Sequence, residues 1–230
     1  MDKPTPADFQ KILGVKFKVV ELLERAFIHR SYLNEHPKSG LEHNERLEFL
    51  GDAVLELVVT DYLYKHFANP EGELTNYRSA LVKTESLSDV AAKLGVSGYL
   101  KLSRGESKGN ERSRALISAN CIEAIIGAIY LDQGYNAASK FIHDQIIAKL
   151  PEILEEGSYL DPKSKFQELA QDKEGVTPSY KVIKESGPDH DKIFEVGAYL
   201  TGRLMGKGKG SSKQVAQLAA AADALKKYQA

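Results

Sequence analysis

The sequence has one cysteine and no tryptophan among its 230 residues, and long uninterrupted apolar runs are missing. The single cysteine, Cys121, cannot form an internal disulfide, and a structural zinc site needs about four ligands. No apolar run approaches the roughly 20 residues that span a membrane. The first residues, Met1–Phe9, lack the apolar core of a signal peptide. The sequence therefore predicts a protein of the cytoplasm, a reducing compartment, with no membrane partner.

The formal net charge is only −1, which by itself does not favour a nucleic-acid binder. The charge is unevenly distributed, however. Residues 161–230 contain 12 Lys and Arg against 9 Asp and Glu, whereas residues 1–160 contain 19 against 23. An acidic part joined to a basic part permits two different functions in one chain.

Residues 9–154 have the spacing of successive amphipathic helices, with no strand-like alternation. Over 152–162 a glycine, several charges and an Asp-Pro step interrupt this pattern, which predicts a linker. We therefore expect an all-α domain over residues 1–157. One predicted apolar stripe consists of Leu47, Leu50, Val54, Leu57 and Val58, and another contains Ile122, Ile125, Ile126 and Ile129.

Residues 161–230 predict a small α+β domain with the order helix, three antiparallel strands, helix. Asp161 and Pro162 are typical of a helix start, and strands are expected at 180–184, 194–200 and 203–207. Three glycines then lead to Ser211 and Ser212, which can cap the last helix. Its predicted apolar face consists of Val215, Leu218, Ala219, Ala222 and Leu225.

The densest candidate chemistry is the segment 43–52. Glu45, Glu48 and Asp52 are spaced so that one face of a helix carries all three carboxylates, which repel one another. A divalent cation would relieve this repulsion, and oxygen ligands without cysteine suit magnesium. A solvated acidic stripe is the alternative that spacing alone leaves open.

A second acidic patch favours the metal site. Asn120 and Glu123 are three positions apart, and Glu123 lies among apolar residues, where a carboxylate is usually paired or holds a metal ion. Small residues nearby would allow this helix to pack closely on another. If that other helix is the first acidic one, Glu48, Asp52, Asn120 and Glu123 converge.

Four segments resemble a known family. Residues 45–53 read ERLEFLGDA, which is similar to the nine-residue signature of ribonuclease III endonucleases. Residues 26–35 (AFIHRSYLNE), 73–81 (ELTNYRSAL) and 122–132 (IEAIIGAIYLD) resemble other segments of that family, in the same order. Residues 161–228 resemble a double-stranded RNA-binding domain. The resemblance covers nearly the whole chain.

The resemblance implies a homodimeric, magnesium-dependent endonuclease that cuts double-stranded RNA during rRNA and mRNA processing. Manganese is a possible substitute for magnesium, and the products would have 5′-phosphate and 3′-hydroxyl ends. Asp52 and Glu123 match catalytic positions, and Glu48 matches a further metal ligand. Dimerisation is expected through the helical domain, where Phe49 and Leu50 are apolar, although Phe49 could equally belong to the core.

One position departs from the family pattern, because Asn120 stands where the family usually has Asp. An amide oxygen can ligate magnesium but brings no negative charge, so we expect weaker metal binding. The alternative is a catalytically weak or inactive protein that still binds double-stranded RNA.

The C-terminal part supplies candidate RNA contacts. Double-stranded RNA is recognised mainly by its shape, through phosphates and 2′-hydroxyls. The start of the last helix can bind a phosphate, lysines would make binding salt-sensitive, and a turn near 187–190 could enter a groove. The predicted RNA-binding residues are Gln167, Glu168, His190, Lys207, Ser212 and Lys213.

Two other chemistries are less well supported by the residues. Histidine acid–base catalysis could use His29 or His43, but we expect the first to pack and the second to border its helix. A platform for single-stranded RNA needs aromatic residues together on one sheet face. The alternation of the strand places Phe194 and Tyr199 on opposite faces.

Overall fold

The computed structural model describes residues 5–159, 161–188 and 192–229. Contacts between residues divide the chain into two compact units, Met1–Tyr159 and Leu160–Ala230. The first unit is helical, and the second has a three-stranded antiparallel sheet with two helices. The predicted fold class, an all-α part followed by a small α+β part, is confirmed.

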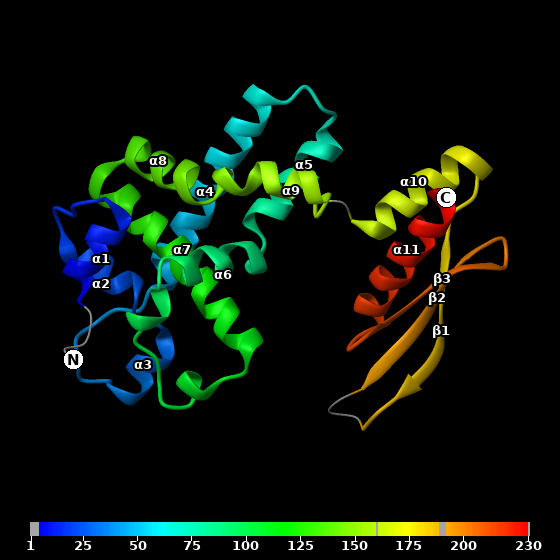
Figure 1. The fold of residues 1–230 in the computed structure, drawn as a ribbon. Coiled ribbons are helices and arrows are strands. Elements are labelled where there is room, and N and C mark those ends of the chain that lie inside the picture. The colour runs from blue at the N-terminus through cyan, green and yellow to red at the C-terminus, as the bar shows by residue number, and fades with distance from the viewer. Residues whose placement is uncertain (1–4, 160, 189–191, 230) are drawn as a thin grey trace. The chain divides into compact units, whose positions relative to one another are not determined.

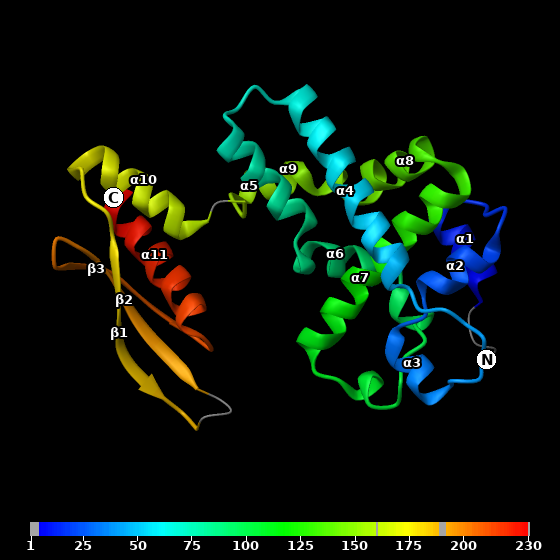
Figure 2. The ribbon, with the colours of Figure 1, turned by 180° about the vertical axis from the view of Figure 1, so that it is seen from behind.

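The first unit packs its helices around two long central ones, α4 and α7 (Figures 1 and 2). Helix α7 contacts α2, α4, α6 and α8, and it carries most of the fully buried isoleucines. The helices are α1 (Pro6–Leu13), α2 (Val20–Ala26), α3 (Arg30–Glu35), α4 (Glu45–His66), α5 (Glu71–Val82), α6 (Thr84–Lys93), α7 (Glu111–Gln133), α8 (Tyr135–Gln145) and α9 (Leu150–Glu156). Short 3₁₀ turns are η1 (Val96–Gly98), η2 (Glu106–Lys108) and η3 (Ile147–Lys149).

Helices α4 and α7 touch backbone to backbone, because each has a glycine at the crossing. A Cβ atom on Gly51 would overlap the carbonyl oxygen of Glu123, and one on Gly127 would overlap the carbonyl oxygen of Leu47. Any larger residue would therefore push the helices apart. The predicted close approach of these two helices is present in the structure.

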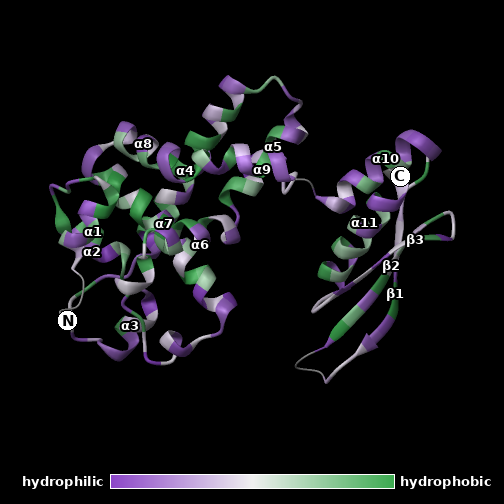
Figure 3. Ribbon diagram, in the orientation of Figure 1, coloured by the Kyte–Doolittle hydropathy of each residue, from purple (hydrophilic) through white to green (hydrophobic). Residues whose placement is uncertain are grey.

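The predicted apolar stripe of α4 is only partly correct. Leu47, Val54 and Val58 are buried, but Leu57 is 58% exposed and Leu50 is half-buried. The predicted apolar residues extend around more of the helix than the core contacts. The apolar residues outside that contact therefore face outward. Figure 3 shows hydrophobic and hydrophilic residues mixed around the helices of both units.

Among the described helices, α7 is long and apolar enough to cross a membrane by length and composition. The expectation from the sequence that no apolar segment approaches the length of a membrane span was therefore wrong for this helix. More than half of the apolar stretch of α7 is buried within the protein, as expected for the core helix of the first unit.

The predicted linker begins too early, since α9 continues to Glu156. Pro151 lies in the first turn of this helix, where its missing N–H does no harm. Ile153 is buried in the core of the first unit, and Leu154 packs against it. The helix ends at Gly157, which has the left-handed conformation that glycine adopts readily.

The second unit consists of α10 (Pro162–Glu174), β1 (Ser179–Ser186), β2 (Ile193–Leu200), β3 (Arg203–Gly210) and α11 (Lys213–Gln229). The strands pair in the order β1-β2-β3, and both pairs are antiparallel. Asp161 caps α10 by accepting a hydrogen bond from the backbone N–H of Ser164. Helices α10 and α11 cover one face of the sheet (Figure 1).

The three glycines that lead to Ser211 all belong to β3, which continues to Gly210 and is longer than the predicted strand 203–207. Cβ atoms on Gly206 and Gly208 would collide with backbone atoms of α11, so glycine permits the helix to lie directly on the strand. The face of α11 that is buried is therefore rotated from the predicted one, and Val215 of the predicted face is 47% exposed. The residues of α11 that are buried are Ala216, Ala220, Ala221, Ala224 and Leu225.

The contact between α4 and α7 predicts unequal effects for two helical glycines. Gly127→Ala should lower the free energy of unfolding by about 2–3 kcal/mol, since backbone atoms block the added methyl group. Gly72→Ala in α5 is the control: a Cβ atom there would meet nothing within 4 Å, so it should be neutral or stabilising by up to about 1 kcal/mol. Urea unfolding measures both, and equal effects would contradict the close contact.

Candidate active site

Asn44 fixes the start of α4. Its side chain is 2% exposed, and its amide donates a hydrogen bond of 3.0 Å to the carbonyl oxygen of Ala26. The Asn44 carbonyl accepts the backbone N–H groups of Leu47 and Glu48 at 2.8 and 2.9 Å. Cys121 of α7 also donates to the Ala26 carbonyl, with an S···O distance of 3.4 Å. The first acidic turn of α4 is thereby tied to α7.

Glu48 and Asn120 meet across the two helices. Glu48 is half-buried, and burial raises the pKa of its carboxyl group above the usual value. The negative charges of Glu45 and Asp52 raise this pKa further, whereas a hydrogen bond from the Asn120 side chain lowers it. The structure therefore brings together one residue from each of the two predicted acidic patches.

Glu123 is the most perturbed carboxyl group of the site. Burial and the nearby charges of Asp52, Glu48 and Glu56 raise the pKa of Glu123 to about 8. Glu56 is absent from the residues predicted from the sequence. Its position four residues after Asp52 on the same helix was the signal that could have identified it. In the structure its carboxylate pairs with Arg78 at 3.1 Å.

Unlike Glu56, the carboxylates at the centre of this site have no cationic partner among the described residues. Within the part of the chain that the structure describes, no Lys, Arg or His forms an ion pair with Glu48, Asp52 or Glu123. A buried carboxylate without a partner is costly, and a bound cation would offset this cost. The donor set of three carboxylates and an amide oxygen suits a hard divalent ion such as magnesium. The residues therefore fit a metal ion.

The site is not a closed cluster, however. Among the described residues, no three side chains of His, Cys, Asp or Glu are grouped closely enough to hold a metal ion by themselves. Asp52 is exposed, whereas Glu123 is half-buried. Like charges repel, and magnesium commonly takes only a few protein ligands and keeps several waters. An open arrangement of this kind suits an ion that also contacts a substrate.

Glu45 and the two nearby histidines lie at helix starts. The Glu45 carboxylate is 3.4 Å from Arg30 and 3.7 Å from the Nδ1 atom of His43. The His29 ring accepts the backbone N–H of Ser31 at the start of α3, and burial lowers the pKa of the ring. His29 thus serves as a helix cap, which differs from the packing role expected from its sequence neighbours.

The predicted RNA contacts of the second unit are divided between two faces. Gln167 and Glu168 are exposed on α10, and Ser212 caps α11 by accepting the Val215 N–H at 3.2 Å. Lys213 lies in the first turn of α11, 3.6 Å from Glu185. Lys207 alternates with the glycines that face α11, so its side chain is directed to the opposite face of the sheet. The predicted contact His190 lies outside the described residues.

Comparison with protein families matches both units. The family described as "Ribonuclease-III-like" matches residues 20–150. The family described as "Double-stranded RNA binding motif" matches residues 162–228. The two matches follow the order of the two units in the chain.

Individual relatives agree with these matches. A protein named Ribonuclease 3 from Enterococcus faecalis is 44% identical over 230 residues, covering 98% of both chains. One of the same name from Carboxydothermus hydrogenoformans is 44% identical, covering 98% of this chain and 96% of the relative. Among solved structures, the nuclease domain of ribonuclease III from Campylobacter jejuni is 36% identical with a TM-score of 0.56. The match covers 62% of this chain and 96% of the Campylobacter domain.

The raised pKa of Glu123 predicts how stability depends on pH in the presence of a chelator. The folded protein holds this proton more tightly than the unfolded chain, so stability from this group is complete below about pH 4.5 and is lost as the pH rises through 8. Glu123→Gln should remove this dependence. At pH 8 we expect the variant to be more stable than the wild type by on the order of 2 kcal/mol, after allowing for solvent screening.

Chemical unfolding at pH 4.5 and pH 8 measures this difference. Glu155→Gln, at an exposed glutamate of α9, is the control and should leave the pH dependence of the wild type unchanged. A variant Glu123→Gln that is no more stable than the wild type at pH 8 would show that Glu123 is not held among uncompensated negative charges.

Proposed function

This chain belongs to the ribonuclease III family of endonucleases that act on double-stranded RNA, and we propose that its cleavage reaction depends on magnesium. In this proposal the products carry 5′-phosphate and 3′-hydroxyl ends, and manganese can replace magnesium. One observation carries the proposal: carboxylates from α4 and α7 gather at the crossing of these helices, and no described cationic side chain pairs with Glu48 or Glu123 there.

The proposal gives the four site residues distinct roles. Glu48, Asp52, Asn120 and Glu123 would hold the ion, and Asp52 and Glu123 would be the catalytic residues. When bound, the ion would supply Lewis acidity, which acidifies water and offsets negative charge on the phosphodiester. Asn120 orients the Glu48 carboxylate by donating a hydrogen bond to it. Glu123, held near Asp52 by the helix crossing, accepts a proton readily because its pKa is raised.

The alternative of a binding protein without activity is not favoured. Its only basis is the amide at Asn120, and the other acidic residues of the family pattern are present at Glu45, Glu48, Asp52 and Glu123. Relatives across the whole length of the chain are named Ribonuclease 3. Precursors of rRNA and mRNA in the cytoplasm are the substrates and the location that we propose.

We further propose that the first unit forms a homodimer through one stripe of α4. Phe49, Leu57 and Tyr64 are 80%, 58% and 79% exposed, and their spacing places them on one side of the helix, beside the acidic face. The exposure of Phe49 removes the possibility that it belongs to the core of its own unit. Exposed apolar residues along one helix are typical of a protein interface.

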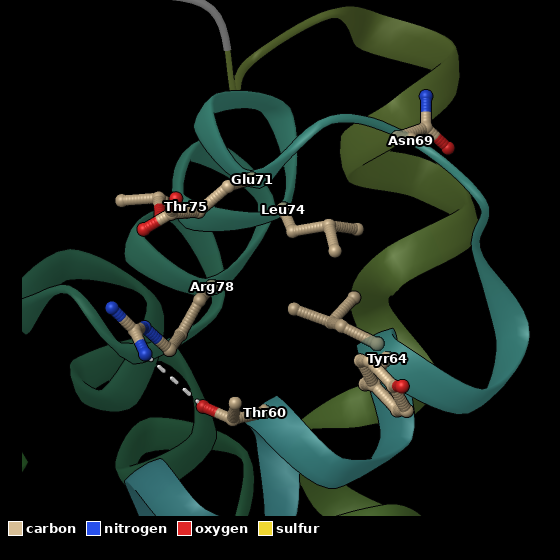
Figure 4. Close-up of a pocket in the computed structure, with 8 residues that line it drawn as sticks. Thr60, Tyr64, Asn69, Glu71, Leu74, Thr75 and Arg78 are labelled. Carbon is tan, nitrogen blue, oxygen red and sulfur yellow. Dashed lines mark hydrogen bonds between the residues drawn. The ribbon is translucent and has the colours of Figure 1, made fainter.

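A cavity of about 480 Å³ adjoins this stripe, between α4 and α5 (Figure 4). Tyr64 and Leu74 line it, and Arg78 closes one side by donating a hydrogen bond of 3.1 Å to Thr60. An apolar side chain of a second copy could fill such a cavity. A solved relative, the Campylobacter jejuni nuclease domain, is described as having a region involved in dimer formation. This similarity supports the same assembly here.

Asn120→Asp tests the metal site most sharply. The substitution would add a negative charge beside Glu48, so the magnesium concentration needed for half-maximal cleavage should fall by about tenfold, equivalent to 1–2 kcal/mol. Cleavage of a long duplex RNA over a magnesium titration measures this change. An unchanged rate and an unchanged metal dependence would show that Asn120 is not a ligand.

Loss-of-charge variants provide the complementary arm of that experiment. Asp52→Asn and Glu123→Gln should abolish cleavage while leaving the affinity for duplex RNA, measured in chelator, largely intact. Cleavage retained by either variant would remove that residue from the catalytic set.

The dimer proposal predicts different outcomes for two exposed leucines. Leu57→Glu should give a monomer at micromolar concentration, because a charge cannot be buried cheaply at the proposed interface. Leu131→Glu on α7 is the matched control, since Leu131 is 53% exposed and lies outside the stripe. Sedimentation equilibrium should give the dimer mass for the wild type and the control. A dimeric Leu57→Glu variant would contradict the proposed interface.

A further inference from the structure

The sheet of the second unit has a face that neither α10 nor α11 covers, which we call the open face. In Figures 1 and 2 both helices lie on the same side of the sheet. The glycines that contact α11 mark the other face, and strand alternation then assigns side chains to the open face. A bulge between Val182 and Lys184 shifts the alternation of β1, so that Lys181 and Lys184 share this face. Its charged residues are Lys181 and Lys184 on β1, Glu195 on β2, and Lys207 and Lys209 on β3.

The open face carries the entire charge excess of this part of the chain. Residues 161–230 contain 12 Lys and Arg and 9 Asp and Glu. When the four lysines and the single glutamate of the open face are set aside, eight residues of each sign remain. The remaining residues of this part of the chain therefore carry no net formal charge.

Among the described residues, one of the four open-face lysines forms an ion pair, whereas four of the eight other basic residues of this unit do. Lys209 pairs with Glu195 at 3.7 Å, and Lys181 lies 5.8 Å from the centre of the Tyr199 ring. Among the described residues, the side chains of Lys184 and Lys207 have no ion pair. On the covered side, by contrast, ion pairs form between Arg203 and Glu174 at 2.9 Å, Lys213 and Glu185 at 3.6 Å, and Lys227 and Asp223 at 2.6 Å.

The lysines form two rows, one on β1 and one on β3, on either side of the central strand β2. Lys181 and Lys207 both pair in register with Gly197, which has no side chain. The Tyr199 ring and Leu204 lie over this glycine, since a Cβ there would be 2.7 Å from Tyr199 Cε2 and 2.8 Å from Leu204 Cδ1. Two strand spacings separate the rows by about 10 Å at the backbone. Glu195 occupies the same central position between Lys184 and Lys209. Two rows of lysines with one carboxylate between them leave a net positive surface, which is complementary to a phosphate backbone.

We propose that the open face is a second RNA-binding surface, which contacts the phosphate backbone of a helix other than the one held by α10 and the start of α11. This inference rests on the proposed function only in taking RNA as the ligand. The consequence is that one copy of the second unit can contact two helices of a branched RNA. Lysines on edge strands also discourage pairing between sheets, and the experiment separates this explanation from RNA binding.

The test measures RNA affinity of the full chain in chelator, so that cleavage does not interfere. The variant is Lys181→Gln/Lys184→Gln, and the matched control is Lys226→Gln/Lys227→Gln, which removes the same charge near the end of α11. Two probes are used. One is a linear duplex of about 16–20 base pairs, the length that one duplex-binding domain spans. The other is a three-way branched RNA that contains this duplex as one arm.

Each phosphate contact changes the affinity by about threefold over a fourfold range of salt. On the branched RNA, the affinity ratio between 50 and 200 mM salt should therefore be about tenfold smaller for the Lys181→Gln/Lys184→Gln variant than for the wild type. On the linear duplex the two proteins should agree. The control should match the wild type on both probes.

Three results would overturn the proposal. If the variant and the wild type show the same salt dependence on the branched RNA, the lysines serve only to discourage pairing between the edges of two sheets. An equal loss on both probes would place them in the primary duplex contact. Binding to phosphatidylserine vesicles is measured for the same proteins. If the lysine variant loses vesicle binding while its binding to the branched RNA is unchanged, the open face binds membranes instead. A wild type that binds both probes but does not cleave with magnesium would refute the proposed function alone.

Discussion

The backbone contact between α4 and α7 is the constraint on which the first unit depends. Gly51 and Gly127 allow the helices to cross with no side chain between them, and this crossing brings Asp52 and Glu48 close to Glu123. The same closeness that packs the core therefore forces carboxylates together. Burial, together with their mutual repulsion, raises the pKa values of Glu48 and Glu123. A metal site at this position would convert an unfavourable arrangement of charges into a binding site.

Much of this arrangement could be predicted from local sequence, because helical spacing and the order of elements depend on near neighbours. The two acidic patches were identifiable since their residues recur at helical intervals. Glu56 follows Asp52 at helical spacing, so the sequence could place it on the acidic face, but its ion pair with Arg78 joins two helices and no local pattern reveals that contact. The exposed position of Leu57 was missed for a related reason: spacing shows that a residue is apolar but not which neighbour covers it.

The second unit illustrates the same limit. In the sequence the three glycines of β3 show only that the chain approaches the serines that cap α11, whereas in the structure they allow α11 to lie directly on the strand. This contact selects the alanine face of α11 for burial and turns Lys207 to the other side of the sheet. The division of charge between two faces follows from that packing, and a count of lysines along the chain cannot show it.

The most direct test of the central claim is cleavage of a long duplex RNA by the purified chain with and without magnesium, followed by analysis of the product ends. If the carboxylates at the helix crossing hold a catalytic ion, cuts should appear only with the metal and should leave 5′-phosphate ends. Binding of the duplex without any cleavage, over a wide range of magnesium and manganese concentrations, would contradict the account.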